Sequence, residues 1–360
     1  MKSRHHECRQ IVRFNPRAGL LAASELLLLL ALLAVLVWVT VQFMATLTNL
    51  SNSASTLNAN CSERCVTRLT LTEDGHRLWV YRLRLGVVRV NLQNGDVEQS
   101  LPLMGMELMA LAHAREGSTT ICCGVDGTVA LFRNSDDPLV AHLKMDDMII
   151  DASVSHDGRV AACATASGLV FGWKFDGTEN IEFQFQLPAD FKITRLTLNR
   201  DGRRLFLASR DGIVSIHDSE TGVHIGPCLN VGEICSTFVW SDDERLVAMM
   251  TASGLVRVYD LVANRTVCEV ATGSSSWQSN ARTLQISPDG RQIAFAADKS
   301  TEIRIVNLES GNICGVLQGH MGMISTLQFA STSDRLYSGS YDGTIREWSL
   351  QTYSQSRVIN

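Results

Sequence analysis

The chain has 360 residues, 45% of them hydrophobic, and a formal net charge of −5. This length and composition allow a large buried core, and length alone predicts two or three domains. Residues 1–25 carry a net charge of +3, so the other 335 residues carry −8. An acidic body of this kind lacks the Lys and Arg clusters that phosphate contacts need, and we expect no nucleic-acid partner.

An apolar segment without charges follows the basic N-terminus. No charged side chain lies in residues 26–62, and the 21 residues from Leu20 to Thr40 would form about 31 Å of helix, enough to cross a bilayer core. We therefore predict a basic cytoplasmic tail at residues 1–19 and a transmembrane helix at residues 20–44. All five early basic residues precede the helix, so the positive-inside rule places the rest of the chain on the exported, periplasmic side.

Three alternatives to this uncleaved signal anchor stay open. A cleaved signal peptide would use a small residue such as Ala45, Ala54 or Ala59. The leader also resembles that of type IV prepilins, although Glu25 is the sixth residue after Gly19 and not the fifth. A cytoplasmic location of the chain after this segment is favoured by the ten cysteines, because so many thiols are unusual in an oxidising compartment.

Residues 45–64 are predicted to form a polar linker, because they are rich in Ser, Thr and Asn and show no periodicity. Cys61 and Cys65 lie close together in an exposed-looking stretch on the predicted exported side, which makes them the candidate disulfide pair. Four other cysteines lie in apolar, strand-like runs, which is typical of small buried hydrophobic residues: Cys122, Cys123, Cys163 and Cys235.

A repeat with a period near 43 residues fills residues 65–360. Its equivalent positions are separated by 42, 41, 44, 42, 47 and 42 residues. They are Val90, Phe132, Trp173, His217, Tyr259, Val306 and Trp348. Repeats of about 40 to 45 residues with four strands are typical of β-propeller blades. At this period the region holds seven blades.

Alternating apolar and polar residues within the repeats predict strands. Leu69 and Leu71 flank Thr70, for example, so one face of this strand should contact a neighbouring blade. Hairpins are predicted at pairs that end in Gly, because two-residue turns need the positive φ that Gly adopts freely. These pairs are Asp74-Gly75, Asn94-Gly95, Asp126-Gly127, Asp157-Gly158, Ser167-Gly168, Asp201-Gly202, Asp211-Gly212, Thr221-Gly222, Ser253-Gly254, Asp289-Gly290, Ser310-Gly311 and Asp342-Gly343.

The last repeat begins with Gly319-His320, turns at Asp342-Gly343 and ends its third strand at Trp348. This pattern resembles one blade of the WD-repeat β-propeller family. The resemblance implies an all-β, seven-bladed propeller of four-stranded antiparallel blades. It also implies a structural hydrogen-bond tetrad in the last blade, formed by His320, Ser338, Asp342 and Trp348.

The other repeats are degenerate, since no copy has an intact Trp-Asp pair and only the last has Gly-His. Related propeller families with looser repeats, such as quinoprotein-like ones, therefore stay open. The WD-repeat family usually closes its ring by pairing N- and C-terminal strands in one blade. Here the last copy is expected to end with its own fourth strand around Gln355 to Ile359, and a contribution of residues 60–64 to the closure is left open.

No catalytic, cofactor or metal site is predicted. The nine histidines show no metal-binding spacing, and no phosphate loop, dinucleotide fingerprint or nucleophile elbow occurs. His217 replaces the Trp of a repeat and is read as a structural substitution. A propeller enzyme of lactonase-like or quinoprotein-like type stays the alternative, because residues gathered around a central channel leave no linear motif. Three convergent carboxylates or histidines in the channel would favour it.

The longest step in the repeat contains an insertion between the fifth and sixth blades, residues 271–280. Its centre is the candidate partner-binding loop: Ser274, Ser275, Ser276, Trp277 and Gln278. Trp277 is either an interface anchor or a side chain folded back onto the propeller. Together these features predict a membrane-anchored, non-enzymatic scaffold for protein–protein interaction, with other proteins as partners.

Overall fold

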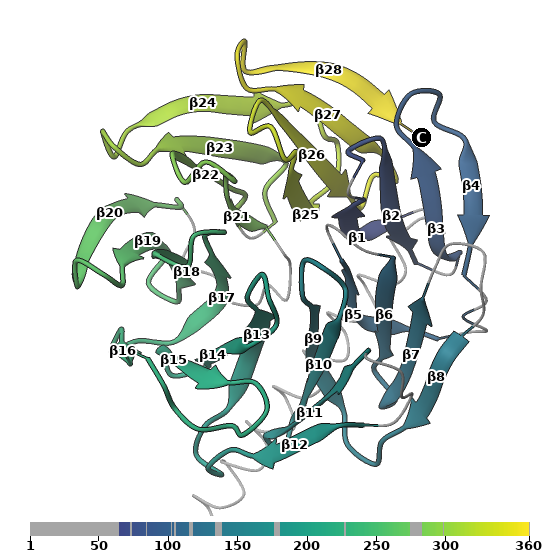
Figure 1. The fold of residues 1–360 in the computed structure, drawn as a ribbon. Coiled ribbons are helices and arrows are strands. Elements are labelled where there is room, and N and C mark those ends of the chain that lie inside the picture. The colour runs from purple at the N-terminus through teal and green to yellow at the C-terminus, as the bar shows by residue number, and fades with distance from the viewer. Residues whose placement is uncertain are drawn as a thin grey trace, which may run out of the picture. The chain divides into compact units, whose positions relative to one another are not determined.

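The computed structural model describes residues 65–359 except 73, 84, 102, 104–105, 115–117, 134–138, 176–180, 227, 274–282 and 298. The described residues form 28 strands in seven four-stranded sheets, each built from strands consecutive in the chain. Neighbouring strands are antiparallel. Figure 1 shows the sheets as blades around a common centre. The predicted all-β, seven-bladed propeller is therefore confirmed.

The predicted cytoplasmic tail (1–19), transmembrane helix (20–44) and linker (45–64) lie outside the described residues. Within the described part of the chain, no helix is long and apolar enough to cross a membrane. The membrane anchor stays a prediction.

Each blade contains four strands, and the third strands end at the positions that set the sequence period. Blades 1 to 3 are β1 (Val66–Leu71), β2 (Arg77–Arg82), β3 (Gly86–Asn91), β4 (Val97–Ser100); β5 (Leu108–His113), β6 (Thr119–Gly124), β7 (Thr128–Arg133), β8 (Leu139–Lys144); and β9 (Ile149–Val154), β10 (Val160–Thr165), β11 (Leu169–Lys174), β12 (Phe183–Gln186). Blades 4 and 5 are β13 (Ile193–Leu198), β14 (Arg204–Ser209), β15 (Ile213–Asp218), β16 (Leu229–Asn230); and β17 (Cys235–Trp240), β18 (Leu246–Thr251), β19 (Leu255–Asp260), β20 (Arg265–Ala271). Blades 6 and 7 are β21 (Leu284–Ile286), β22 (Gln292–Phe295), β23 (Glu302–Asn307), β24 (Ile313–Gln318); and β25 (Ile324–Phe329), β26 (Arg335–Ser340), β27 (Ile345–Ser349), β28 (Ser354–Ile359).

The predicted hairpins are confirmed. All twelve glycines of the predicted pairs have positive φ, between 64° and 89°. Each pair lies between consecutive strands of one blade, as Asp342-Gly343 does between β26 and β27. The tight turns therefore follow from a residue without a Cβ at each of these positions.

The first strand of a blade packs its apolar face on the preceding blade. Leu196 and Leu198 of β13 share a core cluster with Val160 and Ala162 of β10. Burial of these alternating side chains between adjacent sheets is the main source of stability, at about 25 cal/mol per Å² of apolar surface. The core is thus a ring of interfaces between blades.

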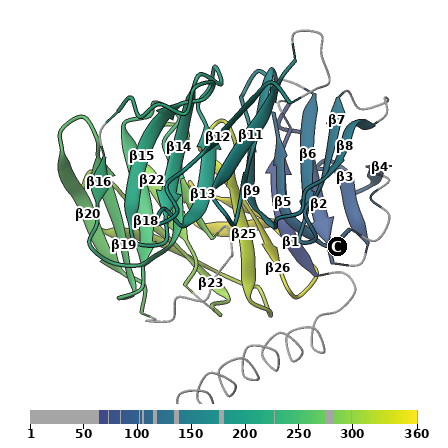
Figure 2. The same cartoon turned by 90° about the horizontal axis from the view of Figure 1, so that it is seen from below.

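Figure 2 shows that the strands run between two rims of the propeller. We call one the connection rim: it carries the turns between second and third strands and the connections from each blade to the next. The opposite rim carries the turns between first and second strands and those between third and fourth strands. The first described residue, Cys65, lies at the connection rim because it directly precedes β1.

Blade 7 closes the ring against blade 1, and in the described residues the two blades share no strand. β28 pairs with β27 as the fourth strand of blade 7, close to the predicted Gln355 to Ile359. The seam is filled by a core cluster that joins Val66 and Leu69 of blade 1 to Tyr337 and Ile345 of blade 7. Closure therefore depends on side-chain contacts between two complete blades.

Hydrogen bonds from side chains to backbone carbonyls also cross this seam. Among the donors are Arg82 Nη1 to Gly343 O (2.8 Å), Ser325 Oγ to Val66 O (2.5 Å) and Arg357 Nη1 to Gln93 O (3.1 Å). Arg82 is buried, so its bond to Gly343 O lies inside the seam, away from water. Such bonds to backbone groups hold the two blades in register without a shared strand.

Cys65 is buried at this seam, contrary to the exposed position that the sequence indicated. Its side chain is 0% exposed, and its Sγ donates to Tyr341 O at 3.0 Å. Ring closure places the turn after β26 against the start of blade 1, which covers the thiol. Cys61 lies outside the described residues, so a Cys61–Cys65 disulfide stays a prediction.

Candidate functional site

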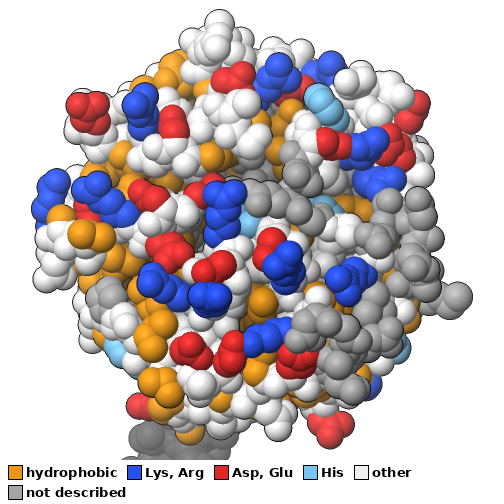
Figure 3. Space-filling model, viewed as in Figure 1, with side chains coloured by type: hydrophobic (Ala, Val, Ile, Leu, Met, Phe, Trp, Pro, Cys, Tyr) orange, Lys and Arg blue, Asp and Glu red, His pale blue; other side chains and the backbone are white. Residues whose placement is uncertain are grey.

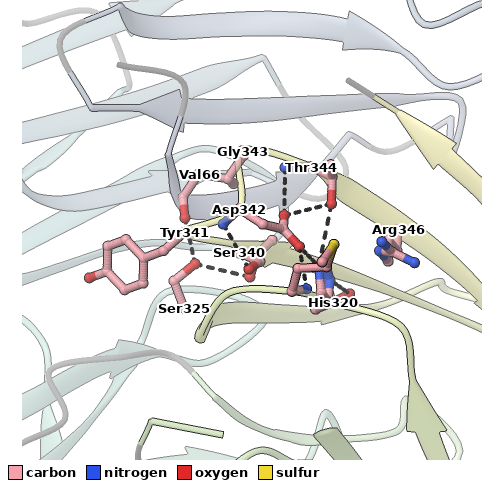
Figure 4. A network of polar contacts seen from close by, with 12 residues as sticks. Val66, His320, Ser325, Ser340, Tyr341, Asp342, Gly343, Thr344 and Arg346 are labelled. Atoms are coloured by element: carbon pink, nitrogen blue, oxygen red, sulfur yellow. Dashed lines mark hydrogen bonds and ion pairs between the residues drawn. The ribbon is translucent and has the colours of Figure 1, made fainter. Parts of the chain in front are cut away.

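The four tetrad residues of blade 7 lie in one hydrogen-bonded chain. His320 Nδ1 lies 2.9 Å from Asp342 Oδ2, and His320 Nε2 lies 2.7 Å from Ser338 Oγ. Trp348 Nε1 donates to the same Ser338 Oγ at 2.8 Å. Figure 4 shows His320 directed at Asp342 beneath the β26–β27 turn. The chain links the connection before blade 7 to its second and third strands.

Asp342 is the hub of this network. Its Oδ2 accepts from the Met321 amide (2.9 Å), and its Oδ1 accepts from the Thr344 amide (2.8 Å) and hydroxyl (2.7 Å). Burial opposes ionisation, but the bonds from His320, Thr344 and the two amides outweigh it and hold the pKa of Asp342 well below its ordinary value. The carboxylate's contribution to stability is thus present above the ordinary Asp pKa and is lost as the pH falls toward the folded-state value.

The other blades replace this network with packing. The positions equivalent to Ser338 hold apolar or thiol side chains: Val80, Cys122, Cys163, Leu207, Met249 and Phe295. Trp173 keeps the indole in blade 3, but its Nε1 has no hydrogen-bond partner among the described residues. The hydrogen-bond network therefore stabilises the structure of one blade, blade 7. The four residues that form it are those that the resemblance to WD repeats implied.

His217 occupies the Trp position of blade 4. Its Nε2 lies 2.9 Å from Ser215 Oγ, and its Nδ1 lies 2.9 Å from Gly222 O. Burial lowers the pKa of His217, so the neutral imidazole is favoured. Both ring nitrogens are used within the blade, as a structural substitution requires.

A cavity of about 430 Å³ opens at the opposite rim, at the mouth of the central channel. Its polar lining includes His113, His156, Arg200 and Asp242. The described residues hold no group of three His, Cys, Asp or Glu side chains that could bind a metal ion. The predicted absence of a metal site concerns the whole chain and stays a prediction.

Acidic and imidazole groups along the channel serve the propeller itself. Asp151 accepts from the Leu196 amide of the next blade at 3.1 Å. Glu244 accepts from Asn199 Nδ2 at 2.9 Å, which also links two blades. His113 lies 2.7 Å from Thr120 Oγ1, and its burial lowers its pKa to about 4, so it is neutral near pH 7.

The connection rim carries a set of exposed apolar side chains, which we call the apolar rim set. It consists of Leu85 (51% exposed), Val125 (37%), Met148 (40%), Ile234 (38%) and Met321 (90%). Leu85 and Val125 lie in turns between second and third strands, and the other three lie in connections between blades. These side chains belong to different blades and connections of the rim, and each is accessible to a partner; exposed apolar side chains that occur singly are common on protein surfaces.

The opposite rim also carries exposed apolar side chains, Val223, Ile225 and Val262, in its turns between third and fourth strands. Its turns between first and second strands hold charged residues in most blades, among them Asp74, Asp157, Arg203, Asp243, Arg291 and Asp334. In Figure 3, Lys, Arg, Asp and Glu side chains surround the centre of the face in view. The two signs are interspersed, so this surface favours solvation over the binding of one strongly charged ligand.

The candidate partner-binding loop, Ser274 to Gln278 with Trp277, lies outside the described residues. Its described flanks, Gly273 and Thr283, lie between β20 and β21 on the connection rim. Sequence reasoning missed the apolar rim set. Its members lie in short segments between strands, and only the sheet topology shows that they share one rim.

Comparisons with known proteins agree with this fold. The family model "WD domain, G-beta repeat" matches residues 311–349. The chain is 23% identical over 235 residues to Periodic tryptophan protein 2 homolog of Caenorhabditis elegans, covering 62% of this chain and 24% of that protein. It is 23% identical over 287 residues to Autophagy-related protein 16 of Arabidopsis thaliana, covering 74% and 54%. The chain thus spans only part of the length of these relatives.

Among solved structures, the β-propeller domain of Cps50 (Swd1) from Myceliophteria thermophila is similar with a TM-score of 0.68 and 17% sequence identity. The similarity covers 79% of this chain and 96% of that domain. At this identity the likeness concerns the fold. Taken with the strand order and the repeat period, it leads to one conclusion: the chain is a seven-bladed β-propeller whose last repeat, residues 311–349, matches the WD-repeat model.

Proposed function

We propose that this propeller is a non-enzymatic platform that binds another protein at its connection rim. The observation that carries the proposal is the apolar rim set, which leaves five large hydrophobic side chains exposed on the connection rim. A partner with complementary apolar groups would remove these side chains from water, at about 25 cal/mol per Å².

Two further observations support a binding role. Asp151 and Glu244 along the channel accept hydrogen bonds from a backbone amide and a side-chain amide of neighbouring blades. These carboxylates therefore contribute to the contacts between blades. The net charge of −8 outside residues 1–25 disfavours contact with phosphates. A protein partner fits these properties better than a nucleic acid.

The alternative, a propeller enzyme, would need its chemistry in the cavity at the opposite rim, whose lining includes two histidines and a carboxylate, His113, His156 and Asp242. Of these, His113 is neutral and hydrogen-bonded to Thr120. The two proposals thus place ligand contact at opposite rims, which makes them separable by surface substitutions.

Charged substitutions on the connection rim should abolish partner binding. The double variant Met321→Asp with Ile234→Asp places two carboxylates in the apolar rim set, where desolvation on binding would cost several kcal/mol. We expect proximity labelling in cells with the full chain to lose the proteins enriched by wild type, and the purified partner to bind the variant at least 100-fold more weakly.

Val262→Asp is the matched control. Val262 is 80% exposed in the turn between β19 and β20, on the opposite rim. This variant should keep the wild-type partner and affinity. If Val262→Asp loses binding while the double variant keeps it, the partner contacts the opposite rim and the proposal is refuted.

We further propose that residues 20–44 anchor the propeller in a membrane with the propeller on the exported side. The apolar composition of this segment and the five basic residues before it support this orientation. In intact spheroplasts, an added protease should digest the propeller. If the propeller is protected until the inner membrane is broken, the propeller is cytoplasmic and the export proposal is wrong.

A further inference from the structure

Two buried thiols of neighbouring blades are in contact. Cys123 lies in β6 of blade 2 and Cys163 in β10 of blade 3, and their Sγ atoms are 3.6 Å apart. Both side chains are 0% exposed. They belong to one core cluster that joins the two blades.

The cross-strand neighbours of this pair are apolar. Ala110 and Val129 lie opposite Cys123, and Ala152 and Phe171 lie opposite Cys163. A disulfide needs the sulfur atoms at about 2.05 Å, so they must approach by roughly 1.5 Å from the observed contact. We expect rotation about χ1 at both cysteines, with a small shift of the two strands, to supply this approach.

We propose that Cys123 and Cys163 form a disulfide between blades 2 and 3 when the chain folds in an oxidising compartment, and remain a thiol pair when it folds in a reducing one. The oxidant is a disulfide donor, either an oxidised dithiol enzyme or a small disulfide such as glutathione disulfide. One thiolate attacks the donor and forms a mixed disulfide. The second thiolate then displaces the donor sulfur, so that two thiols are oxidised and one disulfide is reduced to two thiols.

Burial decides when this exchange occurs. The folded core excludes a donor from both sulfur atoms, and burial raises the pKa of Cys163, which disfavours the reactive thiolate. Exchange must therefore precede the packing of blade 2 on blade 3. Once formed, the bond would close a loop of 40 residues that includes β7 to β9 and would resist reduction in the native state.

The test compares full-length chain refolded from denaturant with reduced or with oxidised glutathione. Free thiols are blocked with iodoacetamide in denaturant, and the digest is searched for a peptide pair joined through Cys163. We expect the linked pair only after refolding with oxidised glutathione, together with a rise of roughly 5 °C in Tm that dithiothreitol reverses in denaturant but not in the native state.

Cys122 and Cys123 are adjacent, so variants must assign the bond. Cys122→Ala should keep the linked pair, whereas Cys123→Ala should lose it together with the Tm difference between the two refolded forms. If a variant fails to fold, the digest of the wild-type chain still tests the proposal, because it shows whether a peptide is linked through Cys163. Absence of a Cys163-linked peptide after oxidative refolding, or a link that persists in Cys123→Ala, overturns it.

Discussion

Replacing Trp348 with alanine should destabilise the propeller by roughly 3–5 kcal/mol, the usual cost of removing a fully buried large aromatic side chain. Trp348 is 1% exposed and packs in the core between blades 6 and 7, and its Nε1 also donates to Ser338. Urea unfolding of the full chain, followed by tryptophan fluorescence and circular dichroism, measures the loss.

A pair of conservative variants separates the hydrogen bond from the packing. Trp348→Phe removes the donor to Ser338 and should cost about 1–2 kcal/mol more than Trp173→Phe, because the indole of Trp173 has no partner among the described residues. Equal losses in the two variants would show that the tetrad adds nothing beyond burial of a ring.

Gly339→Ala should open the seam between blades 7 and 1. A Cβ at this position would lie 2.4 Å from Val66 Cγ1 and 2.9 Å from Thr326 Cγ2, so β1 must move away from β26. Overpacking of a core commonly costs about 1–3 kcal/mol and occasionally more. We expect about 3 kcal/mol here, measured by urea unfolding, because the seam has no shared strand to hold it.

Gly290→Ala is the control for this substitution. Gly290 has a φ of 68°, and a Cβ there would meet nothing within 4 Å, so only the backbone conformation is strained, at about 1 kcal/mol. Faster amide exchange in β1 and β28 of Gly339→Ala, with Gly290→Ala unchanged there, would assign the loss to the seam. A loss in Gly339→Ala no larger than in the control would contradict the proposed role of the seam.

The architecture was predictable because it follows from local residues. A glycine with positive φ is required at each tight turn, so the pair Asp342-Gly343 and its counterparts mark the strand ends in the sequence itself. The alternation at Leu196 and Leu198 likewise reflects burial against the preceding blade. Both signals act within one repeat, and each recurs around the ring.

Contacts between blades were harder to predict, because they depend on how distant repeats meet. Cys65 looks exposed in the sequence, yet the turn of blade 7 covers it. Arg82 stands at the end of β2 and gives no sign that its guanidinium reaches Gly343, which is 261 residues away. The contact of Cys123 with Cys163 likewise arises from the way two separate sheets, with no strands paired between them, pack on one another.

The candidate site shows the same division. The resemblance to WD repeats placed His320 and Asp342 in contact, because a preserved motif fixes its own geometry. The resemblance gave no information on Met321, which follows His320 in the chain and is 90% exposed. Surface exposure on one rim depends on the order of strands around the ring, so the apolar rim set became visible only in the fold.

The proposed function predicts where a partner touches the propeller, and hydrogen exchange of the full chain with and without its purified partner measures this directly. We expect slower exchange on binding at the turn around Val125 and at the connections around Met148, Ile234 and Met321, all on the connection rim. The turns around Asp157, Arg200 and Asp242 should exchange as in the free chain. Protection confined to these opposite-rim turns, with the connection rim unchanged, would contradict the account.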